Sequence, residues 1–222
     1  MSYLDVVLTV VLTTFLAVLG YFFLNYTFKE EGEDKKFLDL KLNKKALVAA
    51  GIFFGIGILT GLFEIYHEKA ATVIIMSYIM LLSVLYFAAI VDFKKSIIPN
   101  SLIIAGLVMY VVFALLSILV VGADAKSFLL ISLAGGLIIG GLLLLVMLVS
   151  KNALGMGDVK LFFLVGLMLG LKNCYEVLLI SMVIMALTAI VLLLLKKVDR
   201  KTAVPMAPFM AIGFAICLAL GM

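Results

Sequence analysis

Long apolar runs separated by short polar segments dominate this chain. A run of about 20 apolar residues is long enough to cross a bilayer as a helix, and the pattern predicts about eight such helices. Their expected ranges are 4–25, 46–63, 72–91, 99–121, 128–150, 153–171, 175–195 and 205–222. We therefore expect an all-α fold, a polytopic bundle of transmembrane helices.

The composition agrees with this pattern. Hydrophobic residues make up 66% of the chain, and the mean hydropathy is +1.35, whereas soluble domains are nearer half apolar. The formal net charge of +4 does not indicate nucleic-acid binding, because the basic residues are divided among short loops. The lipid bilayer is therefore an expected partner, and no nucleic acid is expected.

Lysine and arginine are concentrated on one side of the expected bundle. The loops after the first, third, fifth and seventh helices, with their flanks, hold 14 of the 17 basic residues. An excess of Lys and Arg marks cytoplasmic loops. We therefore expect these loops in the cytoplasm, both termini outside, and Asp92 and Asp158 together on the cytoplasmic side.

These two aspartates stand at the edges of apolar runs. Asp92 ends the run 73–91, and Asp158 precedes the run 161–171. A carboxylate at the edge of the hydrocarbon is costly, which makes it a candidate functional residue. To reach about 20 residues, the sixth helix must begin near Ala153, so that Asp158 lies roughly one turn below the surface. The alternative is that Asp158 is a solvated N-cap, a common role of Asp at a helix start.

Two neighbouring carboxylates can hydrolyse a peptide bond. Because like charges a few ångströms apart share one proton, one carboxyl group activates water and the other protonates the leaving amine. No other catalytic set can be assembled. The only histidine, His67, lies in an expected outer loop, and Cys174 and Cys217 fit no metal spacing. We therefore expect Asp92 and Asp158 to act as a pair without a metal or other cofactor.

Glycines occur beside Asp158 and along several expected helices. Gly155 and Gly157 leave room for unusual backbone dihedrals and for close approach of another backbone, such as an extended substrate. Glycines four residues apart within an apolar run are expected to pack helices together. These pairs are Gly51 and Gly55, Gly57 and Gly61, Gly136 and Gly140, and Gly166 and Gly170.

Three segments of the chain resemble the motifs of the type IV prepilin peptidases. Residues 92–100, D-F-K-K-S-I-I-P-N, resemble the first catalytic motif, an aspartate followed by a short basic stretch and Ile-Pro-Asn. Residues 155–161, G-M-G-D-V-K-L, are similar to the second motif, G-x-G-D-V-K-L. Residues 204–209 are similar to the proline-rich segment that opens the last helix of these enzymes. The resemblance extends from about Val73 to the C-terminus.

The resemblance implies an integral-membrane aspartyl endopeptidase of the G-x-G-D type, with Asp92 and Asp158 as the catalytic pair. A six-helix catalytic core would occupy residues 72–222. Residues 1–71 would form two further transmembrane helices joined by a short charged cytoplasmic loop, 26–45. Other motif residues are expected to position the substrate, namely Gly155, Gly157, Lys160, Pro99, Asn100, Pro205 and Pro208.

The substrates that the resemblance implies are type IV prepilin-like or archaeal preflagellin-like precursors in a prokaryotic cell membrane. Such a precursor carries a short basic leader before an apolar helix, and it is cut between them at the cytoplasmic face. Many bacterial members also methylate the new N-terminus through a cytoplasmic domain with paired C-x-x-C motifs. Here the loop from Thr27 to Lys45 contains no cysteine and is too short for such a domain. We therefore expect no N-methyltransferase activity.

The same loop contains four acidic residues, Glu30, Glu31, Glu33 and Asp34. Two interpretations of them stay open. They attract the basic leader of a substrate, or they belong to a solvated charged loop together with the nearby lysines.

Two other classes of membrane protein also use membrane-embedded aspartates. A presenilin-like protease shares G-x-G-D but has Tyr before the first aspartate, where this chain has Val91. A proton- or cation-coupled transporter would use Asp92 and Asp158 as relays, with acids near the middle of the bilayer on broken helices. The transporter is the alternative to the protease.

Overall fold

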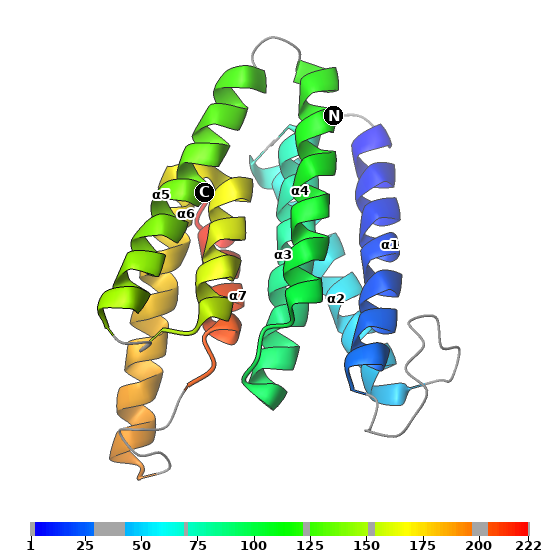
Figure 1. The fold of residues 1–222 in the computed structure, drawn as a ribbon. Coiled ribbons are helices and arrows are strands. Elements are labelled where there is room, and N and C mark those ends of the chain that lie inside the picture. Colours follow the sequence, from blue (N-terminus) through cyan, green and yellow to red (C-terminus); the bar gives the residue numbers. More distant parts are fainter. Residues whose placement is uncertain are drawn as a thin grey trace. The chain divides into compact units, whose positions relative to one another are not determined.

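The computed structural model describes residues 3–28, 43–68, 71–121, 125–150, 154–196 and 204–221. Within these ranges the regular structure is entirely helical (Figure 1). The elements are α1 (Tyr3–Thr27), α2 (Lys44–Phe63), the π-helix η1 (Glu64–Glu68), α3 (Thr72–Lys95), α4 (Asn100–Val121), α5 (Ala125–Val149), α6 (Met156–Leu194) and α7 (Ala207–Ala219). The all-α fold expected from the apolar runs is confirmed.

Helices α1 to α6 are the six that, among the described residues, are long and apolar enough to cross a membrane. Helix α7 has 13 residues, whereas a helix needs about 20 to span the hydrocarbon without tilt or thinning. These helices make the chain a multi-pass membrane protein. The number of eight spans and the outer position of both termini stay predictions.

Helix α6 contains two of the expected spans. Gly170 interrupts it with φ 74° and ψ −176°, and the two segments fold back on each other there (Figure 1). Only glycine adopts this backbone conformation without strain. The structure therefore differs from the expected ranges 153–171 and 175–195. The helix begins at Met156 rather than near Ala153, and it reverses at Gly170 without a separate loop.

The chain divides into two compact units, Met1–Phe87 and Ala88–Met222. The division falls within α3. The first unit contains α1, α2, η1 and most of α3, and the second contains the end of α3 with α4 to α7. Asp92 and Asp158 therefore belong to the same unit.

In the first unit, α1 packs against α2 where glycines of α2 meet threonines of α1. A Cβ atom on Gly61 would lie 2.3 Å from Thr9 Cγ2, and one on Gly57 would lie 2.6 Å from Thr13 Cγ2. A larger residue at either position would push the two helices apart. Gly57 and Gly61 thus pack helices, as their spacing predicted.

Two expectations for the first unit are wrong. Gly51 and Gly55 are exposed, and no described atom lies within 4 Å of a Cβ atom built on either, so this pair does not pack the described helices. His67 belongs to η1 rather than to a loop. Its exposed ring stacks on that of Phe63 with the ring centroids 4.9 Å apart.

In the second unit, α5 packs closely against the first segment of α6. A Cβ atom on Gly166 would lie 2.6 Å from the carbonyl oxygen of Gly135, and one on Gly140 would lie 2.9 Å from Phe163 Cδ2. Backbone-to-backbone approach of this kind is open only to small residues. The packing role expected for Gly140 and Gly166 is confirmed, and it fixes the start of α6 against α5.

The expected charged loop, 26–45, lies mostly beyond the part of the chain that the structure describes, because residues 29–42 fall outside it. The two interpretations of its four acidic residues, Glu30, Glu31, Glu33 and Asp34, therefore stay open. The expectation that the chain lacks a methyltransferase domain there also stays a prediction. Cys174 and Cys217 are buried free thiols.

Candidate active site

Asp92 is held inside the second unit by contacts from a distant helix. It lies in the last turn of α3, which ends at Lys95, and the residue is only 5% exposed. Its Oδ2 atom accepts a hydrogen bond from the Ala207 backbone N–H at 3.0 Å, and the Met206 backbone makes a further hydrogen bond to it. The start of α7 thus fixes the position of this carboxyl group.

The proline-rich segment before α7 creates that contact. Met206 is the N-cap residue of α7 but makes no side-chain capping bond, and a proline, Pro208, lies in the first turn. The first N–H groups of a helix need an acceptor, and Asp92 supplies one from α3 at the positive end of the α7 dipole. The structure therefore brings Met206 and Ala207, which lie between Pro205 and Pro208, to Asp92, a contact that our sequence analysis missed. The weak N-cap residue Met206 was the available signal, because it implies an acceptor from elsewhere.

Asp158 is held by its own helix. It lies in the first turn of α6, and the N-cap residue is Gly155, so the interpretation of Asp158 as the N-cap is wrong. The Asp158 backbone N–H donates to the Gly155 carbonyl oxygen at 3.1 Å, and a backbone hydrogen bond from Gly155 reaches the Asp158 carboxyl group. This reciprocal pair resembles a capping box, and it leaves Asp158 partly exposed.

The two glycines of this motif serve different contacts. A Cβ atom on Gly155 would lie 2.9 Å from Asp158 Oδ2, and one on Gly157 would lie 3.1 Å from Ile98 Cβ. Gly155 thus leaves room for the carboxyl group, and Gly157 lets the segment before α4 approach α6. The expected unusual dihedrals are not found at Gly155, since its φ of −70° and ψ of 139° are open to any residue.

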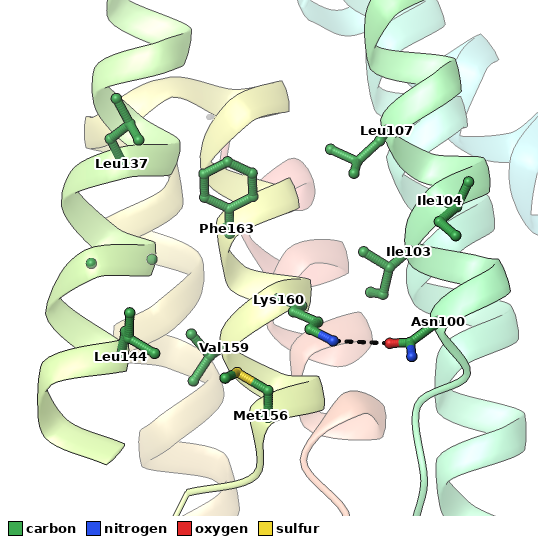
Figure 2. Close-up of a pocket in the computed structure, with 12 residues that line it drawn as sticks. Asn100, Ile103, Ile104, Leu107, Leu137, Leu144, Met156, Val159, Lys160 and Phe163 are labelled. Atoms are coloured by element: carbon green, nitrogen blue, oxygen red, sulfur yellow. Dashed lines mark hydrogen bonds between the residues drawn. The ribbon is translucent and has the colours of Figure 1, made fainter. Parts of the chain in front are cut away.

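A side-chain hydrogen bond also joins the first motif, residues 92–100, to the second motif, residues 155–161. Lys160 Nζ donates to Asn100 Oδ1 at 3.0 Å (Figure 2). Asn100 opens α4, and the Pro99 carbonyl oxygen accepts the first backbone bond of that helix, from the Leu102 N–H at 3.1 Å. Pro99 and Asn100 thus start α4 beside the start of α6. The structure thus brings Pro99 and Asn100 together with Lys160. The spacing of the motifs in the sequence could not show this.

The two aspartates lie near each other in space. The charge of Asp92 acts on the Asp158 carboxyl group, although 65 residues separate them in the sequence. One is at the end of α3, the other at the start of α6, and both side chains therefore lie where helices end rather than in mid-helix. Within the described residues, no group of three His, Cys, Asp or Glu side chains could hold a metal ion. The arrangement suits proton exchange between two carboxyl groups.

A model of the type IV leader peptidase family matches residues 79–190, about half of the chain. The matched range contains both aspartates and both motifs around them. Comparisons with curated proteins and with solved structures gave no match.

Proposed function

Because this chain belongs to the type IV leader peptidase family, we propose that it is an aspartyl endopeptidase that removes the short basic leader from type IV prepilin-like or preflagellin-like precursors. The family makes the chain a protease with a prepilin-like substrate. The proposal adds the aspartic mechanism, the catalytic residues Asp92 and Asp158, and cleavage at the cytoplasmic face of a prokaryotic cell membrane. It also holds that the chain has no N-methyltransferase activity.

The observation that carries the aspartic mechanism is the proximity of the Asp92 and Asp158 carboxyl groups. The charge of Asp92 acts on Asp158, and Ile98, shortly after Asp92 in the chain, lies against Gly157, which directly precedes Asp158. In the proposed reaction, the ionised carboxyl group takes a proton from a water molecule, whose oxygen attacks the scissile carbonyl carbon. The other carboxyl group gives its proton to the amide nitrogen as the C–N bond breaks. The products are a leader with a free carboxyl group and a precursor with a free amino group.

The distribution of charge supports the cytoplasmic face. The loops that carry most of the Lys and Arg residues flank the ends of helices at which Asp92 and Asp158 lie, and such loops are cytoplasmic in most membrane proteins. A loop from Thr27 to Lys45 without cysteine supports the absence of a zinc-binding methyltransferase domain. The product made by the purified chain should therefore carry an unmethylated N-terminus, which mass spectrometry of that product checks.

The proposal is tested by co-expressing a type IV prepilin with the wild-type chain, with Asp92→Asn and with Asp158→Asn. Asparagine keeps the shape of the side chain but cannot exchange the proton, so each variant should lose cleavage by about a thousandfold or more. Asp5→Asn is the matched control, because Asp5 lies in the first unit, where its carboxyl group bonds the Thr72 hydroxyl. This control should cleave like wild type.

Retention of cleavage by either variant would remove that residue from the catalytic pair. If the wild-type chain cuts none of a range of leader sequences, and proton or cation uptake into vesicles is lost in Asp158→Asn, the transporter becomes the better interpretation. The two assays therefore separate the protease from its alternative.

A further inference from the structure

An apolar groove of about 680 Å³ lies between α4, α5 and the first segment of α6 (Figure 2). All three helices belong to the second unit. Its apolar lining includes Ile104 and Leu107 of α4, Leu137 and Leu144 of α5, and Val159 and Phe163 of α6. The contacts described above for the catalytic residues do not use this groove.

The groove begins at the level of Asp158. Met156, Val159, Lys160 and Phe163 line it, and their spacing of three and four residues places them along one face of α6. Asp158 directly precedes Val159 in the first turn of the same helix. The groove therefore starts at the level of Asp158 and follows α6 into the apolar part of the unit.

The groove has one polar end and is otherwise apolar. Lys160 and Asn100, joined by their hydrogen bond, lie at the end near Asp158 (Figure 2). Ile104 and Leu137 on its walls are 60% and 64% exposed. A groove with exposed apolar walls in a membrane protein is open to a helix or a lipid from the bilayer.

The wall formed by α5 can admit another backbone closely. Gly141 lines the groove, and no described atom lies within 4 Å of a Cβ atom built on it. Small residues at such positions let transmembrane helices approach each other and pack. The shape of this wall thus suits one face of an incoming helix, which would dock through side chains one turn apart.

We propose that this groove receives the apolar segment that follows the scissile bond of the precursor. This inference rests on the proposed function. The apolar segment is covalently joined to the scissile bond, so it must start beside the catalytic carboxyl groups, and the groove starts at the level of one of them, Asp158. The lining gives its direction, because the polar end with Lys160 and Asn100 lies at the level of Asp158 while the apolar walls continue along α6.

Filling the groove tests the proposal. In the series Gly141→Ala, Gly141→Leu and Gly141→Phe, the added side chain has free space around it, so the helices need not move. Cleavage of the full precursor should fall as the added side chain grows, and phenylalanine should lower kcat/KM by roughly tenfold or more, as the loss of a well-packed contact region does. Gly55→Phe is the control, since Gly55 has the same free space but belongs to α2 of the first unit and does not line the groove.

Cross-linking tests the same contact without catalysis. In the Asp158→Asn background, Leu137→Cys should form a disulfide with a cysteine placed in the apolar segment of the precursor. Leu187→Cys should not, because Leu187 is 59% exposed but does not line the groove. The native Cys174 and Cys217 are buried, which keeps the background reaction low.

The outcomes separate this proposal from the proposed function. A cross-link at position 137 in a chain whose wild type cuts no precursor would support the groove and contradict the peptidase. Normal cleavage by Gly141→Phe, or equal cross-linking at positions 137 and 187, would overturn the groove alone. If Gly141→Phe loses a co-purified phospholipid while its cleavage of the precursor is unchanged, the groove is a lipid site and the proposal is wrong.

Discussion

Asp92 and Asp158 carry the same chemical group but are fixed in opposite ways. Asp92 is almost completely buried and is held by the backbone of α7, which is 115 residues away along the chain. Asp158 is partly exposed and is held by Gly155, three residues before it in the same chain segment. One position thus depends on tertiary packing and the other on local sequence. Substitutions near each aspartate should therefore act on different properties.

Among substitutions of residues beside the two aspartates, the largest effect is expected from Gly155→Ala, which should lower activity while preserving the fold. The new Cβ atom would lie 2.9 Å from Asp158 Oδ2, so the end of the Asp158 side chain must shift. A misplacement of about 1 Å in a catalytic group can cost roughly a hundredfold in rate. The predicted result is a loss of that size in kcat/KM for precursor cleavage, measured in detergent or vesicles.

The matched control for this variant is Gly51→Ala, since Gly51 has open space around it. Control and variant should unfold within about 1 kcal/mol of each other, because replacing an N-cap glycine by alanine costs no more than that. Full activity in Gly155→Ala would mean that the present position of the Asp158 carboxyl group is not needed for cleavage.

A smaller effect, on stability, is expected at Asp92. Asp92→Ala leaves the buried Ala207 N–H without its acceptor, which should cost about 1–2 kcal/mol. Asp158→Ala should cost less, because water can replace a partly exposed carboxyl group. Thermal unfolding in detergent compares the two variants. Equal melting temperatures would show that the α7 contact contributes nothing to the stability of the fold.

Asp92→Asn separates the contribution of Asp92 to stability from its proposed role in catalysis. The asparagine oxygen can still accept the Ala207 N–H, so the variant should be more stable than Asp92→Ala while remaining equally inactive. A variant as unstable as Asp92→Ala would mean that α7 needs the negative charge and not only an acceptor.

The smallest effect is expected at the hydrogen bond between Lys160 and Asn100, which joins the two motifs at the surface of the second unit. Lys160→Met removes the hydrogen bond to Asn100, which should cost about 1 kcal/mol or less. Activity should fall several-fold, and Asn100→Ala should cause a similar loss. In a double-mutant cycle the combined variant should lose little more than either single one. Fully additive losses would show that the two side chains act independently.

The sequence predicted those parts of the fold that depend on local patterns. The expected range 99–121 matches α4 closely, because Pro99 and Asn100 give a clear helix start. The range 153–171 fitted less well, since the helix begins at Met156 with Gly155 as its N-cap residue, and the apolar pattern does not mark that start. The reversal at Gly170 was placed two residues too late, because Lys172 and Asn173 are the first polar residues of that stretch.

In the candidate site, the sequence predicted residue types but not their contacts. Asp92 and Asp158 stood out because carboxylates at the edge of apolar runs are rare. The bond between Ala207 and Asp92 could not be predicted, since it joins a backbone group to a side chain far away in the sequence. The glycine pair spacing also failed to separate Gly57 and Gly61, which pack against α1, from Gly51 and Gly55, which do not. Only the positions of neighbouring helices distinguish them.

The reversal of α6 at Gly170 has a consequence for the membrane around the proposed catalytic pair. At about 1.5 Å per residue, the segment from Met156 to Gly170 is about 22 Å long, whereas the hydrocarbon core of a bilayer is about 30 Å thick. A bilayer adapts to such a hydrophobic mismatch by thinning around the short helix. Thinning brings headgroups and water down toward the start of α6, where Asp158 lies. In the proposed reaction, this single glycine would thus help to supply the water that hydrolysis in a membrane requires.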